Sequence, residues 1–149
     1  MSLKVKLYSK CQDFLNERLE VIQNTIADIQ NSLQSETKSS AGDKHETGRA
    51  MLQLEREKAG QQLAELQKLN ETLEKIEVEA SHDNVALGSL VLTSQLNYFI
   101  AISAGKIEMD NSCFYAISVA TPIAKVLLSK EVGAVIEFRN TKFTIIEIQ

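Results

Sequence analysis

Apolar residues in the first half of the chain recur at the spacing of a helical seam. One series runs from Leu15 to Leu33 in alternating steps of four and three residues, and a second series runs from Leu52 to Ile76. The members are Leu15, Leu19, Ile22, Ile26, Ile29 and Leu33, followed by Leu52, Ala59, Leu63, Leu66, Leu69, Leu73 and Ile76. Steps of three and four place side chains on one narrow face of a helix. The pattern therefore predicts two long amphipathic helices.

A short polar segment from Ser35 to Gly42 lies between the two series and has no apolar anchor. Such a segment interrupts a helix. Two helices of similar length around a short break cover each other's apolar face when they fold back as an antiparallel hairpin. We therefore predict a first domain over residues 1–80, a coiled-coil hairpin with its tip near residues 35–47. A coiled coil that pairs two chains is the alternative.

Residues 81–149 have the composition of strands, with 11 of the 36 charged side chains. Five runs rich in β-branched and aromatic residues, separated by turn-like pieces, predict strands at Leu90–Thr93, Tyr98–Ser103, Cys113–Ala120, Ala134–Phe138 and Phe143–Ile148. Thr121 as N-cap and Pro122 at the first helical position predict one short helix. The predicted fold class is α+β, the helical hairpin followed by a second domain, a small antiparallel sheet of four or five strands with one short helix.

Composition and charge exclude several classes of function. The 149 residues carry 16 Lys and Arg against 20 Asp and Glu, for a net charge of -4, which argues against a bulk electrostatic nucleic-acid binder. Cys11 and Cys113 lie far apart, so neither a disulfide framework nor a zinc site is indicated. The chain has no apolar run long enough to span a membrane and no signal-like start. We expect a soluble, cytoplasmic protein.

The candidate chemistry lies at the start of the second helix. Asp43 and Glu46 are three residues apart, so their carboxylates emerge on one side of the first helical turn. The pattern is also that of a capping box, in which the acids satisfy backbone N–H groups. Two exposed carboxylates can alternatively supply oxygen ligands to a Mg²⁺ that a partner holds. His45 and His82 have no second ligand at metal-binding spacing, so we expect no metal or cofactor of the protein's own.

With these features the whole chain resembles the Gre family of transcript-cleavage factors. The family's tip motif Gly-Asp-x-x-Glu-Asn is similar to Gly42–Thr47. The family's Ile-Ser-x-x-Ser-Pro-Ile-Ala stretch resembles Ile117–Ala124, with similarity continuing through Lys130, and Leu87-Gly88-Ser89 resembles the family's Ile-Gly-Ser.

This resemblance implies an N-terminal coiled coil that enters the secondary channel of bacterial RNA polymerase, and a C-terminal domain of FKBP-like fold. It implies that Asp43 and Glu46 help to position a Mg²⁺ held by the polymerase, which then hydrolyses backtracked nascent RNA. The chain itself would then not be an enzyme. The segment that docks on the polymerase would include Pro122, Ile123, Lys125 and Lys130.

Three residues near the tip depart from the family's pattern. Thr47 and Arg49 stand where the family usually has Asn and Glu, and Lys44 adds another cation. A cation beside the acids can pair with them and weaken metal binding. Two alternatives to cleavage stimulation therefore stay open. One is a polymerase-binding regulator without cleavage activity, and the other is a coiled-coil or FKBP-like interaction module.

Overall fold

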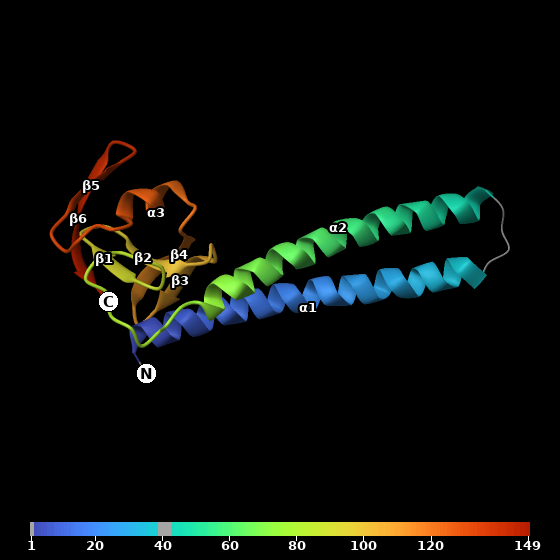
Figure 1. Ribbon diagram of the computed structural model, residues 1–149, viewed down its shortest axis with the longest axis horizontal. Coiled ribbons are helices and arrows are strands. Elements are labelled where there is room, and N and C mark those ends of the chain that lie inside the picture. Colours follow the sequence, from blue (N-terminus) through green and yellow to red (C-terminus); the bar gives the residue numbers. More distant parts are fainter. Residues whose placement is uncertain (1, 39–42) are drawn as a thin grey trace. The chain divides into compact units, whose positions relative to one another are not determined.

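Two long helices and a six-stranded sheet with one short helix make up the computed structural model (Figure 1). It describes residues 2–38 and 43–149, and for residues 36–38 and 43–45 it describes the backbone only. The elements are α1 Leu3–Lys38, α2 Asp43–Glu74, β1 Leu90–Thr93, β2 Asn97–Ala101, β3 Gly105–Met109, β4 Ser112–Ser118, α3 Pro122–Leu127, β5 Val135–Phe138 and β6 Thr141–Ile148. The predicted α+β class, with a helical hairpin before a small sheet, is confirmed.

Contacts within the chain define two compact units. The outer hairpin, Leu15–Asn70, forms one unit, and the start of α1 up to Phe14 joins residues 71–149 in the other. This grouping follows packing, whereas the predicted domains 1–80 and 81–149 follow composition, and they stay a prediction. None of the helices, over the residues described, combines the length and the apolar character that a membrane span needs.

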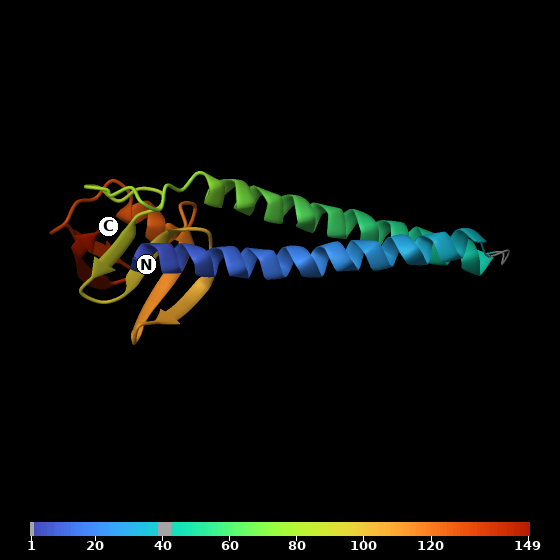
Figure 2. The same ribbon diagram turned by 90° about the horizontal axis from the view of Figure 1, so that it is seen from below.

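The apolar seam holds the outer hairpin together. Ile22, Ile26 and Ile29 of α1 are buried with Ala59 of α2. Four seam residues pack against them, namely Leu33, Leu52, Leu63 and Leu66. Burying a large aliphatic side chain contributes about 1.5–3 kcal/mol. Both views show α1 and α2 side by side in this unit (Figures 1 and 2), so the pairing predicted from the heptad-like spacing is within one chain.

The start of α1 is fastened within the other unit by three polar contacts. The Lys4 ammonium donates to the Ala80 carbonyl oxygen at 2.6 Å, and the Tyr8 hydroxyl donates to the Leu73 carbonyl oxygen at 2.8 Å. Lys6 forms an ion pair with Asp110 at 3.3 Å. Lys4 is only 4% exposed. The first turns of α1 are therefore fixed within this unit.

The sheet has the strand order β3-β4-β2-β1-β6-β5. Neighbouring strands are antiparallel except β2 and β4, which pair in parallel. The expectation of an antiparallel sheet of four or five strands is therefore wrong in strand count and in this one pairing. β3 was not predicted because it is short and mostly exposed. It turns into β4 through Asp110 and Asn111, both with positive φ, as a two-residue hairpin requires.

One face of the sheet packs on α3. The core there contains Val91, Tyr98, Ile100, Leu127, Ile136, Phe143 and Ile145. As predicted, Thr121 caps α3, its hydroxyl oxygen accepting from the Ala124 N–H at 3.3 Å, and Pro122 begins the helix. Ile123, Val126 and Leu127 all pack into this core, as their spacing predicts.

Candidate functional site

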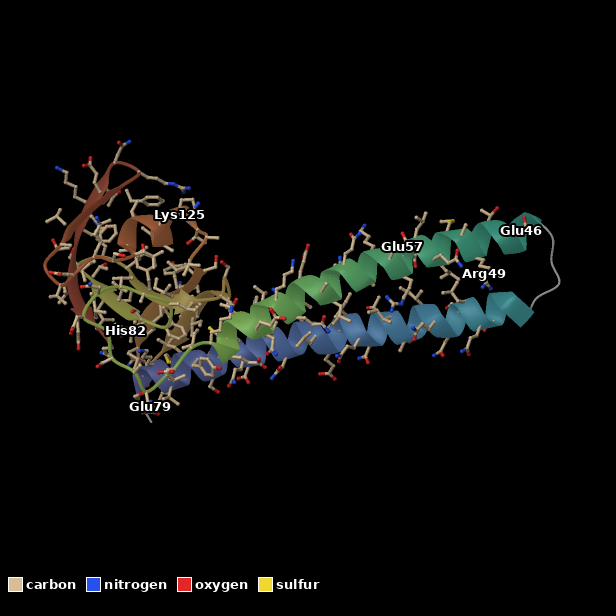
Figure 3. The ribbon with its side chains drawn as sticks, in the orientation of Figure 1. Glu46, Arg49, Glu57, Glu79, His82 and Lys125 are labelled. Carbon is tan, nitrogen blue, oxygen red and sulfur yellow. The ribbon has the colours of Figure 1, made fainter. Side chains whose placement is uncertain are left out.

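The start of α2 carries the two acidic residues of the predicted tip. The helix begins at Asp43, so Asp43 and Glu46 both lie on its first turn. Glu46 is exposed (Figure 3). The side chains of Asp43, Lys44 and His45 lie outside the described residues. The backbone thus places both acids at a helix N-terminus, where negative charge suits the helix dipole.

Arg49 lies one turn beyond Glu46 and is half-buried. It is on the side of α2 that faces α1 (Figure 3). Both Arg49 and Thr47 have interaction partners. A cation three residues after Glu46 is close enough to influence its carboxylate. That Lys44 and Arg49 oppose metal binding at the tip stays a prediction.

Two apolar side chains on the same stretch of α2 point away from the seam. Met51 is 60% exposed and Leu54 is 66% exposed, whereas Leu52 between them packs into the hairpin. Met51 and Leu54 do not belong to the series of apolar residues, spaced by three and four, that forms the seam. The sequence pattern therefore gives no prediction for them. Exposed apolar residues are common on protein surfaces, so these two are not by themselves a binding site.

The four residues that the resemblance assigns to docking occupy different environments around α3. Pro122, Lys125 and Lys130 are exposed, and Lys125 lies on α3 itself (Figure 3). Ile123 is half-buried and packs against the core of the sheet. Pro122, Lys125 and Lys130 are thus accessible to a partner, and Ile123 mainly fixes the helix.

The end of α3 is held by a backbone clasp that the sequence did not reveal. Ser129 has φ of 68°, and its N–H donates to the Val85 carbonyl oxygen at 2.8 Å. The Val85 N–H donates in return to the Lys130 carbonyl oxygen at 2.9 Å. Val85 is 2% exposed. The segment before β1 therefore fixes the position of Lys130, although the two are distant in sequence.

A shallow hollow of about 410 Å³ lies between the end of α3 and β5. Its lining comprises Lys125, Val126, Leu128 and Lys130 on one side and Val135, Ile136 and Glu137 on the other. Neither lysine ammonium has a hydrogen-bond or ion-pair partner among the residues that the structure describes. The hollow therefore presents positive charge beside apolar surface.

His82, in the segment before the sheet, is half-buried (Figure 3). Its Nδ1 is buried without a hydrogen-bond partner within the described part of the chain. A hollow nearby is lined by His82, Asp83, Asn84 and Glu131. Over the described residues there is no cluster of three His, Cys, Asp or Glu side chains that could hold a metal ion.

Comparisons with known proteins add a distant likeness to a solved structure. No protein-family model and no curated protein matches the chain. Among solved structures, the transcription factor Gfh1 is similar over 95% of this chain and 92% of that chain, at 21% sequence identity and a TM-score of 0.35. A likeness this distant assigns no role to any residue of this chain.

Proposed function

We propose that this chain is an RNA polymerase-binding factor whose hairpin tip presents Asp43 and Glu46 to the polymerase and stimulates cleavage of backtracked RNA. The observation that carries the proposal is the position of both acids on the first turn of α2, at the N-terminal end of a helix of 32 residues. A helix of that length measures about 48 Å. The tip motif and the Thr121-Pro122 motif support it, because both belong to one resemblance.

The contribution of the tip is electrostatic. Glu46 is exposed and Asp43 shares its turn, so together the two can offer carboxylate oxygens to a cation, the ligands that Mg²⁺ prefers. A Mg²⁺ shared with the polymerase would supply a Lewis acid that activates water for attack on the RNA phosphate. Because both residues lie on one helical turn, their side chains start from backbone positions that the helix fixes relative to each other.

The test is a transcript-cleavage assay on a stalled, backtracked bacterial polymerase at fixed Mg²⁺. The variant Asp43→Asn with Glu46→Gln keeps the shape of both side chains and removes both charges. We expect the unmodified chain to accelerate RNA shortening and the variant to bind the polymerase without accelerating it. A matched control, Asp28→Asn with Glu57→Gln, removes two exposed charges elsewhere on the hairpin. If the control loses as much stimulation as the tip variant, the tip acids have no special role.

A second candidate keeps polymerase binding and omits cleavage, so that the tip acts as a plug or modulator. Arg49 favours this reading, since it places a cation one turn from Glu46. The same assay separates the two, because binding without faster RNA shortening identifies the modulator. In that case Arg49→Gln tests the cause, and recovered cleavage would show that the cation suppresses the acids.

The third candidate is an interaction module that does not bind polymerase at all. The hairpin and the small sheet also suit a protein-binding role, so this reading rests on the fold alone. A pull-down with purified core polymerase distinguishes this candidate, because an interaction module of this kind would not retain the polymerase.

A further inference from the structure

The sheet ends in an edge strand whose outer side is unpaired. β5 is last in the strand order and pairs with β6 alone (Figure 1). An edge strand presents backbone N–H and C=O groups that another extended chain can bind. β5 has the sequence Val-Ile-Glu-Phe, and Val135 is 67% exposed. This edge is therefore open to strand addition.

The register shows which backbone groups face outward. Phe138 pairs with Thr141 across a two-residue turn, Arg139-Asn140, in which both residues have positive φ. The pair that flanks such a turn is hydrogen-bonded, and bonded pairs alternate along an antiparallel ladder. Phe138 and Ile136 therefore bond to β6, whereas the N–H and C=O groups of Val135 and Glu137 face the free edge. Within the described part of the chain, no hydrogen bond occupies these four groups.

The free edge of β5 adjoins the hollow beneath the end of α3. An extended chain lying there would meet an edge strand on one side and a helix on the other, an arrangement that suits peptide binding by strand addition. Lys125 and Lys130 line the helix side without ion-pair partners in the described chain, and Glu137 lines the strand side. At the end of β5 the Arg139 guanidinium lies 5.0 Å from the centre of the Phe138 ring. Three cations against one carboxylate favour an acidic partner.

The opposite edge of the sheet differs in the features that matter for binding. β3 carries Lys106 and Glu108, which pair with each other at 3.1 Å on the exposed strand. Paired charges along an edge discourage the addition of another strand. β5 has no such pair within the described residues. The contrast singles out β5 as the receptive edge.

We propose that β5 binds an extended, acidic peptide segment of a partner protein, which adds as a seventh strand and places carboxylates near Lys125 and Lys130. The backbone of Val135 and Glu137 would supply the hydrogen bonds, and the two lysines would supply the preference for acidic sequence. Lys125 and Lys130 are also among the residues that the resemblance assigns to polymerase docking, so this proposal names a chemistry for that surface. Its test uses no polymerase, and its failure can therefore be distinguished from a failure of the cleavage assay.

The test is a titration of the full-length, isotope-labelled chain with a peptide of about seven alternating Glu and Val residues, long enough to span the four-residue strand. NMR would record chemical shifts and amide hydrogen exchange. We expect shift changes confined to β5 and the end of α3, with slower exchange at Val135 and Glu137. A peptide with Lys in place of Glu should bind at least about tenfold more weakly, because it meets like charge.

Charge reversal provides the matched comparison. Lys125→Glu with Lys130→Glu should weaken binding of the acidic peptide by about tenfold or more and improve binding of the Lys peptide. Lys10→Glu with Lys75→Glu changes the net charge equally at two exposed positions outside the hollow, and should have little effect. Equal binding of both peptides, or unchanged exchange at Val135 and Glu137, would overturn the proposal. So would concentration-dependent protection of these amides without peptide, since a second copy would then occupy the edge.

Discussion

Replacing Thr121 by alanine tests whether the motif at the start of α3 is structural. The Thr121 hydroxyl accepts a hydrogen bond from the Ala124 N–H at 3.3 Å and donates one to the Ser118 carbonyl oxygen at 2.8 Å. One side chain thus joins the end of β4 to the beginning of α3. The helix is only six residues long, and its Ala124 and Leu127 are fully buried. Loss of the cap therefore affects residues that belong to the core.

The magnitude follows from the two hydrogen bonds. Loss of an N-cap side chain costs about 1 kcal/mol, and the second hydrogen bond adds about 0.5–1.5 kcal/mol. Thr121 is half-buried, so water can replace part of what is lost. We expect Thr121→Ala to lower the free energy of unfolding by about 1–2 kcal/mol. Thr121→Ser retains the hydroxyl and should lower the free energy of unfolding by only about 0.3–0.5 kcal/mol.

Urea denaturation followed by tyrosine fluorescence measures this difference. The chain has no Trp, and Tyr98 and Tyr115 lie in the sheet with ring centres 6.4 Å apart, so their emission reports on this part of the molecule. With a urea dependence of about 1–3 kcal/mol per molar, the urea midpoint of Thr121→Ala should fall by roughly 0.3–2 M at an unchanged slope.

Two results would refute the structural reading of Thr121. One is an alanine variant as stable as the unmodified chain, and the other is a serine variant as unstable as alanine. If Thr121→Ala were fully stable yet failed to bind polymerase, the hydroxyl would act at the interface instead. Thr121→Ser then provides the check, because a direct hydrogen bond to a partner would survive in it.

Three further predictions follow from burial. Burial raises the pKa of Cys11 to about 12, so a thiol reagent should modify only Cys113 in the native chain and both cysteines in denaturant; rapid native labelling in Cys113→Ser would contradict this. Burial lowers the pKa of Lys4 below its ordinary value of 10.5. Between the lowered pKa and 10.5 the unfolded chain therefore binds this proton more tightly than the folded chain, and the free energy of unfolding should rise as the pH increases through this range. The urea midpoint should rise less with pH in Lys4→Met than in the unmodified chain. An equal rise with pH in both proteins would show that Lys4 does not cause it. Finally, a fragment of residues 81–149 should unfold at a lower temperature than the full chain in calorimetry, and an unchanged midpoint would show that this part of the chain needs neither α1 nor α2.

The parts of the fold that the sequence predicted well are those set by local periodicity. Steps of three and four residues mark the buried face of α1 and α2, and the Thr121-Pro122 pair marks the start of α3. β3 lacked such a signal, because it is mostly exposed and only Ile107 and Met109 are apolar. Its place at the sheet edge, and the parallel pairing of β4 with β2, depend on contacts between strands that are distant in the sequence. No local pattern contains that information.

The candidate sites divide in the same way. The position of Glu46 on a helical turn follows from spacing alone, whereas the hollow beside β5 depends on the register of β5 with β6 and on the clasp between Val85 and Lys130. The burial of Lys4 also has no signal in the sequence around it. A lysine near a chain start is expected in solvent, and its burial depends on a carbonyl 76 residues away. Residues that gain their role from a distant partner carry no signature in their own neighbourhood.

Composition changes near residue 80, whereas packing divides the chain after Phe14 and after Asn70. Composition changes where helices give way to strands, but Leu7 and Cys11 of α1 are fully buried in the unit that contains the sheet. Leu73 and Ile76, at and after the end of α2, are 2% and 7% exposed in that unit. Burial of one large apolar side chain contributes about 1.5–3 kcal/mol, and a domain of this size is stable by only about 5–15 kcal/mol. Cutting the chain at residue 80 removes all four side chains, so we expect the remaining fragment to be less stable than the full chain. The first residues of α1 and the end of α2 thus group with the sheet by packing, although their sequence resembles that of a separate coiled coil.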